Sequence, residues 1–151
     1  MVRTSHERRR GAILLTAGVL LAGAAWAVDA PSKKKAPTVR LIVDYGDGVE
    51  KHFTALPYKK GNDGMTVLDA LGAAKASPHG ITFDSRGRGA YTMLTRIDDL
   101  KNGGAGADAK NWTYRVNDKF AEDSLGVHVI QAGDEVRWTY AKTSDAFKNK
   151  Q

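Results

Sequence analysis

The sequence contains no cysteine in its 151 residues. Disulfide bonds, thiol chemistry and cysteine-based metal sites are therefore excluded, and the stability of the fold must come from a packed core. The sequence also has no G-x-S-x-G nucleophile elbow, no H-E-x-x-H zinc motif and no phosphate-binding P-loop. These absences predict a domain with no catalytic residues, no metal site and no cofactor of its own.

Residues that often bind metals or exchange protons are present but scattered. His52, His79 and His128 fall on different predicted elements, without the spacing of a ligand set. Acidic pairs such as Asp98–Asp99 are sequence neighbours beside predicted turns. Neighbours in a strand point to opposite faces, so these pairs are poor partners for acid–base chemistry.

Positive charge is concentrated outside the predicted domain. The net charge is +6, but residues 1–27 hold four arginines and one glutamate, and the remainder has 19 basic and 16 acidic residues. Lys33–Lys35 supply that whole excess, in a proline-flanked stretch that is either a solvated spacer or a contact to an anionic membrane or wall polymer. A nucleic-acid partner is not expected, because its binding needs a basic face on the domain itself.

The first 27 residues predict a signal peptide. The basic stretch Met1–Arg10 precedes an apolar run, and the small-residue pattern Ala-Trp-Ala ends at Ala27. We expect cleavage between Ala27 and Val28, and a periplasmic, secreted or envelope-associated location. The alternative is an uncleaved anchor, because residues 11–28 are just long enough to span a bilayer. That segment would then be the only contact with the membrane.

The remaining chain divides into a linker over 28–37, a compact domain over 38–141 and a polar tail over 142–151. Alternating apolar residues, with Asp47-Gly48 between them, predict an opening hairpin over 38–45 and 49–56. Helical spacing then predicts one helix over 65–77, capped by Thr66 with Asp69 and ended by Pro78. Further strands are predicted at 81–83, 91–97, 112–116, 119–120, 127–130 and 135–140. This order indicates an α+β fold, a mixed sheet packed on one helix.

The tripeptide Trp-Thr-Tyr occurs twice, at 112–114 and 138–140. Because alternate residues of a strand share a face, each copy places its aromatic residues together and its polar residues opposite. The pattern predicts two strands of one core rather than a stacking platform, which would need basic residues beside the rings. An internal repeat is not supported, since the flanking residues differ. The predicted inward residues are Trp112, Tyr114, Val116, Val136, Trp138 and Tyr140.

The stretch "DSRGRGA" at 84–90 is the candidate binding loop. Arg86 and Arg88 lie among glycines that allow the backbone to approach an anion, so the loop could hold a carboxylate or phosphate. The alternative is a solvated turn. Arg115 and Arg137 form a second, weaker basic patch on the predicted outer face of the sheet.

Five segments together resemble the DUF4430 family, also described as the transcobalamin-like C-terminal domain. They are "VRLIVDYGDG", "MTVLDALGAA", "RGAYTMLTRIDDL", "NWTYRVND" and "VIQAGDEVRWTY", within residues 38–141. The resemblance implies a β-grasp (ubiquitin-like) fold. It assigns structural positions to Trp112 and to the turn residues Asn117, Gly126, Gly133 and Asp134. Asp118 stands where glycine is usual, so a more strained turn is expected there.

In transcobalamin the related domain covers bound cobalamin together with a helical domain, and this sequence contains no such helical partner. The resemblance therefore implies cobalamin only as a possible ligand. Two functions remain open: an exported binding module for a corrinoid or other small anionic ligand, and a protein–protein or wall-associated interaction module. The first predicts a pocket beside the helix or the Arg86/Arg88 loop, and the second an open sheet edge or an exposed apolar patch. The oligomeric state is not predicted.

Overall fold

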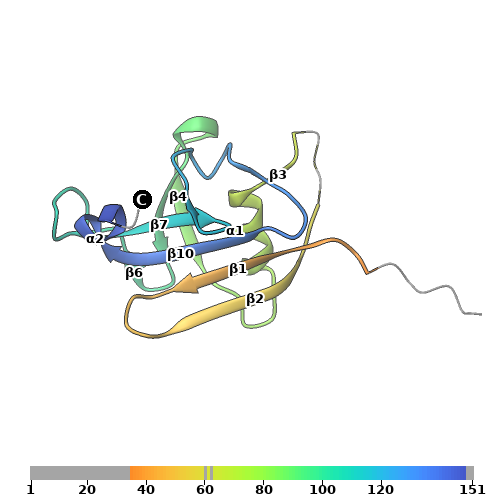
Figure 1. The fold of residues 1–151 in the computed structure, drawn as a ribbon, viewed down its shortest axis with the longest axis horizontal. Coiled ribbons are helices and arrows are strands. Elements are labelled where there is room, and N and C mark those ends of the chain that lie inside the picture. The colour runs from red at the N-terminus through yellow and green to blue at the C-terminus, as the bar shows by residue number, and fades with distance from the viewer. Residues whose placement is uncertain (1–34, 60, 62, 149–151) are drawn as a thin grey trace, which may run out of the picture. The chain divides into compact units, whose positions relative to one another are not determined.

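The computed structural model describes residues 35–59, 61 and 63–148, which belong to one compact unit (Figure 1). The predicted signal peptide, its cleavage site Ala27–Val28 and most of the linker lie outside the described residues. No helix in the described part combines the length and apolarity that a membrane crossing requires. The fold is α+β, mostly sheet with few helices, and its sheets are arranged as in a sandwich.

The opening hairpin forms as its alternating pattern predicts. Strand β1 (Thr38–Asp44) pairs antiparallel with β2 (Glu50–Pro57). The Asp47 carboxylate accepts a hydrogen bond from the backbone nitrogen of Val49 at 3.0 Å and so helps to fix the turn. The inward side chains of β1 are fully buried: Val39, Leu41 and Val43.

Helix α1 (Val67–Lys75) starts at the predicted cap and is shorter than the predicted 65–77. The backbone nitrogen of Asp69 donates to Thr66 Oγ1 at 3.2 Å, and the Asp69 carboxylate accepts from the Thr66 nitrogen at 2.8 Å. This capping box satisfies amide groups that would otherwise lack partners at the helix start. Met65–Thr66 form the short strand β3 instead of a helical turn. The helix buries Val67, Ala70, Leu71 and Ala74.

The first and last strands of the domain lie side by side. β1 pairs in parallel with β10 (Glu135–Lys142), within a five-stranded sheet of order β2-β1-β10-β7-β8. Helix α1 contacts β1 and β2 on one face of this sheet (Figure 1). The smaller sheets have the orders β3-β9 and β4-β5-β6. The remaining strands are β4 (Phe83–Arg86), β5 (Met93–Ile97), β6 (Leu100–Lys101), β7 (Lys110–Val116), β8 (Lys119–Phe120) and β9 (Val129–Ile130).

The twin aromatic strands confirm the core prediction. In the antiparallel pair of β7 and β10, Tyr114 lies opposite Trp138 and Trp112 lies opposite Tyr140. The ring centroids of these pairs are 4.8 Å and 5.1 Å apart. Trp112, Tyr114 and Trp138 are buried, and Tyr140 packs against the core at its edge. Large aromatic area is thereby removed from water on the face that packs toward α1.

The strand predicted at 81–83 is present but begins two residues later. β4 begins at Phe83, and Ile81 is buried within a loop. At Thr82 the backbone nitrogen donates to the Asp98 carboxylate and the carbonyl accepts from the Asp98 nitrogen, so both groups bond to a turn instead of a strand. Arg86 therefore lies in β4, not in a loop.

The polar tail predicted over 142–151 contains a short helix, α2 (Thr143–Lys148). Thr143 attaches its start to the loop between β6 and β7, because its backbone nitrogen donates to the carbonyl of Ala109 at 3.0 Å. The side-chain amide of Asn111 donates to Thr143 Oγ1 at 2.9 Å. These contacts come from distant parts of the chain, which local composition does not reveal.

Candidate functional site

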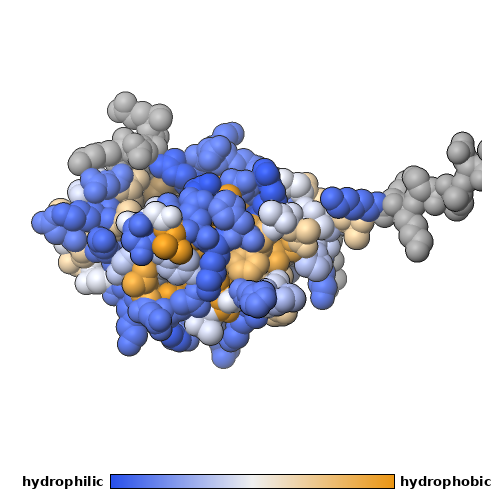
Figure 2. Space-filling view, turned by 90° about the horizontal axis from the view of Figure 1, so that it is seen from below, coloured by the Kyte–Doolittle hydropathy of each residue, from blue (hydrophilic) through white to orange (hydrophobic). Residues whose placement is uncertain are grey.

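A surface groove runs beside α1, where the connection from β2 to β3 passes the helix. Its volume is about 780 Å³. Figure 2, which views the molecule from the β2 side, shows apolar surface gathered in the middle of this face between hydrophilic margins. The lining residues in the described part of the chain are Pro57, Lys59, Gly61, Gly64, Met65, Asp69, Gly72, Ala73, Ala76, Ser77 and Pro78.

Small side chains account for the opening of this groove. Gly72, Ala73 and Ala76 place little bulk on the side of α1 that turns away from the sheet. A Cβ atom built on Gly72 would meet no atom within 4 Å, so the space beside it is open. Met65, only 2% exposed, contributes the buried part of the lining. The groove offers an apolar surface that a ligand could cover.

The polar side chains of the groove differ in whether they already form hydrogen bonds or ion pairs within the protein. Asp69 accepts hydrogen bonds from the Thr66 backbone nitrogen and hydroxyl, both at 2.8 Å, so its carboxylate is committed to the helix cap. Ser77 donates its hydroxyl to the carbonyl of Ala73 at 3.0 Å. Lys59 is exposed and makes no ion pair or hydrogen bond with the described residues. As far as the described residues go, the positive charge of Lys59 at the rim of the groove is therefore not neutralised by an ion pair.

The predicted anion-binding arginines do not line this groove. Arg86 ends β4, where it pairs with Met93, and Arg88 precedes a short 3-10 helix, η1 (Gly89–Tyr91). Both arginines are exposed. Gly87 between them has a structural reason: its φ is +82°, and a Cβ there would lie 2.0 Å from the Tyr91 carbonyl oxygen.

The residues assigned structural positions by the family resemblance lie at turns that hold the sheet together. Asn117 has a φ of +50° and Asp118 a φ of +64°, as the expected strained turn requires. The side chain of Asn117 donates to the Asp134 carboxylate at 2.7 Å and accepts from the Glu135 nitrogen at 2.9 Å. The Gly133 nitrogen donates to the Thr38 carbonyl at 2.8 Å. The contacts of Asn117 fasten the β7–β8 turn to the start of β10, and the contact of Gly133 fastens the segment before β10 to β1.

Gly126 allows two loops to pack closely, because it has no side chain. A Cβ there would lie 2.4 Å from Thr92 Oγ1 and 2.6 Å from the Gly89 carbonyl oxygen. Ser124 reinforces the same contact, since its hydroxyl lies 2.7 Å from the Thr92 carbonyl and 3.1 Å from that of Gly89. The segment after β8 is thereby held against the segment before β5.

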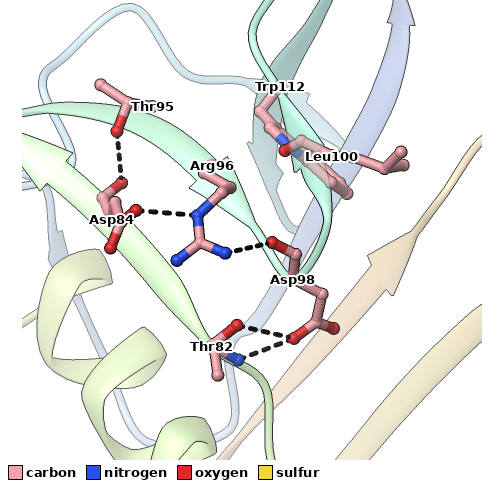
Figure 3. A network of polar contacts seen from close by, with 7 residues as sticks. All are labelled: Thr82, Asp84, Thr95, Arg96, Asp98, Leu100 and Trp112. Atoms are coloured by element: carbon pink, nitrogen blue, oxygen red, sulfur yellow. Dashed lines mark hydrogen bonds and ion pairs between the residues drawn. The ribbon is translucent and has the colours of Figure 1, made fainter.

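A polar network centred on Asp98 was missed from the sequence. The Asp98 carboxylate accepts hydrogen bonds from the Tyr45 hydroxyl at 2.6 Å, Lys51 Nζ at 2.9 Å and the Thr82 nitrogen at 2.7 Å. Figure 3 shows the Thr82 side of this network and the Arg96 guanidinium, which donates to the Asp98 carbonyl at 2.7 Å. Tyr45, Lys51 and Asp98 also line a second cavity, of about 510 Å³.

The electrostatics of this network favour an ionised Asp98 and a neutral Tyr45. Burial disfavours the Asp98 carboxylate, but the hydrogen bonds from Thr82, Tyr45 and Lys51 outweigh it and hold the pKa of Asp98 below its ordinary value. Burial, together with the hydrogen bond to Asp98, raises the pKa of Tyr45 far above the usual tyrosine range. Tyr45 is thus a fixed donor rather than a base, and the network braces the strands instead of exchanging protons.

The histidines remain apart from one another. His52 contacts Glu50 at 2.6 Å on the open face of β2, and His128 Nδ1 lies 3.6 Å from the Asp123 carboxylate. Within the described ranges, no cluster of three or more histidine, aspartate or glutamate side chains is placed to hold a metal ion. On the outer sheet face Arg115 and Arg137 lie opposite each other, and Arg137 forms an ion pair with Glu50 at 2.7 Å.

These features define a small α+β domain with an apolar surface groove and internally paired polar residues. A family model described as "Domain of unknown function (DUF4430)" matches residues 64–142, slightly more than half of the 151 residues, so the chain belongs to the DUF4430 family. The matched range contains α1, whose outer side lines the groove, and the two aromatic strands β7 and β10. The opening hairpin lies before the matched range.

No curated protein sequence matches the chain significantly. Among solved structures, a similar chain is a candidate metal-binding protein from Ruminococcus gnavus, with a TM-score of 0.46 and 17% identity. The alignment covers 70% of this chain and 97% of that one. A likeness this distant does not transfer metal binding to the present protein.

Proposed function

We propose that this protein is an exported, non-enzymatic binding module of the cell envelope, and that the groove beside α1 binds a small anionic ligand. The observation that carries the proposal is the groove itself, an opening of about 780 Å³ with Lys59 at its rim, where this lysine has no ionic partner among the described residues. Ligand sites typically have volumes of about 300–1,000 Å³, mostly apolar walls and few charged groups. Lys59 would supply the charge that orients an anionic group, and Ala73 and Ala76 the apolar contact.

We further propose that the domain has the β-grasp fold, within the boundaries 38–141. A hairpin followed by a helix, with the first strand parallel to the last, supports this assignment. The contacts of α1 with β1 and β2 also support it, since they place the helix across the opening hairpin.

Cobalamin is the first ligand to test, on the strength of the family resemblance alone. A groove open along one side would contact one part of a corrinoid, and a partner protein would have to cover the rest. Smaller anions fit the groove without such help.

The test is thermal unfolding of the purified protein with and without saturating cobalamin, and with a panel of small carboxylates and phosphates. A ligand at a hundred times its dissociation constant adds about 2.7 kcal/mol, which raises the midpoint by roughly ten degrees. Lys59→Gln should reduce the shift, whereas the matched change Lys119→Gln, on the exposed strand β8, should not. Gly72→Leu should abolish the shift by filling the groove. If no ligand shifts the midpoint, binding by this chain alone is wrong.

A protein–protein module is the second candidate, favoured by β2. This strand pairs with β1 on one edge, and no described strand pairs with its other edge. An extended segment of another protein could add there through backbone hydrogen bonds. Hydrogen exchange in the presence of fractionated envelope extract would report protection of the β2 amides. Protection confined to the amides that line the groove would instead support the small-ligand proposal.

A further inference from the structure

A further hollow adjoins the groove on the side of strand β9, and we call it the β9 hollow. Its volume is about 570 Å³, and Gly61, Gly64 and Asp69 line both openings. Two of these shared residues are glycines, so the boundary between the openings is mostly backbone. The other described residues that line the β9 hollow are Asp63, Thr66, Leu68, Gly126, Val127 and Val129.

The β9 hollow has an apolar wall that is open to solvent. The side chains of Val127 and Val129 line it and are 43% and 44% exposed. Leu68 lines the same hollow and is only partly buried where it packs against the core. Exposed apolar side chains that share one hollow indicate a surface that a ligand or partner covers.

This wall is held in place by the fold. Val129 lies opposite Thr66 in the paired strands β3 and β9. Gly64 has a φ of +94°, and a Cβ atom there would lie 2.6 Å from Val129 Cγ1. The backbone of the β2–β3 connection therefore packs directly on Val129, which a residue with a side chain would prevent. The apolar wall is thus formed before any ligand arrives.

Charge distinguishes the two ends of the combined surface. Lys59 lines the groove but not the β9 hollow, and no lysine, arginine or histidine is among the described residues that line that hollow. Asp63 instead brings an exposed carboxylate to it. An anionic group is therefore attracted to the Lys59 end and repelled from the β9 end. The part of a ligand that covers the two valines has to be uncharged and apolar.

We infer that the ligand of the groove is a carboxylate that carries an unbranched alkyl chain, as a fatty acid does. The carboxylate lies at Lys59, and the alkyl chain passes Gly64 and covers Val127 and Val129. One lysine matches the single negative charge of such a head group. The inference rests on the proposed function, because it uses the same groove, and it adds the chemical class of the ligand.

Titration of the ¹⁵N-labelled protein with butanoate and with octanoate tests the inference. Full burial of a methylene group strengthens binding about fourfold, so a half-covered one strengthens it about twofold. Octanoate has four more methylene groups and should bind at least about tenfold more tightly than butanoate. It should also shift the backbone amide resonances of Val127 and Val129, which butanoate should leave unchanged.

Replacing both valines by threonine keeps their branched shape and makes the wall polar. The double variant Val127→Thr/Val129→Thr should lose most of the advantage of octanoate and bind butanoate as before, which also shows that it is folded. Val127→Thr alone, at an exposed turn, should lose part of that advantage. Val49→Thr is the matched control, because Val49 is 55% exposed and lines neither opening.

Lys59→Gln should weaken both carboxylates by a similar factor and leave their ratio unchanged. The inference is overturned if octanoate binds no more tightly than butanoate, or if both threonine variants keep the full ratio. Butanoate binding without an effect of chain length would overturn the inference alone and leave the proposed function standing. If neither these carboxylates nor any other anion binds, the proposed function is wrong as well.

Discussion

Replacing Asp98 by asparagine is expected to destabilise the fold by about 2–3 kcal/mol. The substitution keeps the shape of the side chain and tolerates the φ of +46° at this position, so backbone strain adds little. It removes the charge that accepts hydrogen bonds from Tyr45 and Lys51, which link the hairpin of β1 and β2 to the β5–β6 turn.

The magnitude follows from the exposure of these contacts. The bonds from Tyr45 and Lys51 are partly buried, and each bond to a charged acceptor contributes roughly 1–1.5 kcal/mol after allowance for the partial exposure of Lys51. The bonds from Thr82 are exposed, and water replaces them at little cost. For a domain of this size the total lowers the unfolding midpoint by about 10–15 °C.

Chemical denaturation and calorimetry of the purified protein provide the measurement. Asp99→Asn is the matched control, because Asp99 is the exposed neighbour and should change stability by less than about 0.5 kcal/mol. If Asp98→Asn is as stable as that control, the bracing role assigned to the network is wrong.

The same variant has a pH signature. The pKa of Asp98 is depressed in the folded state, so its contribution is fully present above the unfolded value of about 3.9 and is lost as the pH falls through the folded value. The native protein should therefore lose stability below about pH 4 more steeply than Asp98→Asn. Parallel curves for the two proteins would contradict the assignment of a depressed pKa.

Further substitutions test other features. Gly72→Ala should stabilise α1 by about 0.5–1 kcal/mol in urea denaturation, because the added methyl group meets open space and alanine favours helix. Thr66→Ala should cost about 1 kcal/mol in the same assay, since it removes the helix cap, and Thr66→Ser should restore most of it. In an alkaline absorbance titration the last tyrosines to ionise should be Tyr45 and Tyr114, whose pKa values burial raises, and Tyr45→Phe should remove part of that late signal.

The core strands were predictable because their signal is local. Alternation alone determines that Trp112 and Tyr114 share a face, whichever strand lies beside them. The structure confirms this, with Tyr114 directly opposite Trp138. The helix cap at Thr66 was predictable for the same reason, since both of its partners lie within one turn.

The Asp98 network was not predictable, because its members come from separate segments. The pair Asp98–Asp99 was predicted to lie beside a turn, and the structure places both residues within one. Nothing near them in the sequence points to Tyr45 or Lys51. The same limit explains why the strand expected at 81–83 begins only at Phe83, since the backbone of Thr82 bonds to Asp98 instead of a neighbouring strand. The sequence around Asp98 indicates a turn, but it does not indicate which distant residues donate hydrogen bonds to the carboxylate.

The groove was also not predictable, because it forms where segments that are not neighbours in the sequence pack together. Glycine and alanine at Gly72, Ala73 and Ala76 were visible in the sequence, but the path of the β2–β3 connection beside them was not. Conversely, the glycines around Arg86 and Arg88 suggested close approach to an anion, whereas Gly87 is needed for contact with the Tyr91 carbonyl.

The parallel pairing of β1 with β10 has a consequence for how the chain acquires its structure. β10 lies inside the five-stranded sheet, between β1 and β7, yet among the described strands it comes last in the sequence. Without β10, neither β1 nor β7 has its partner in the middle of the sheet. The five-stranded sheet therefore cannot form until β10 has been synthesised. Contacts between such distant segments also make folding slow. A chain that stays unfolded while it is made is suited to passage through a membrane channel before it folds, as the proposed export requires.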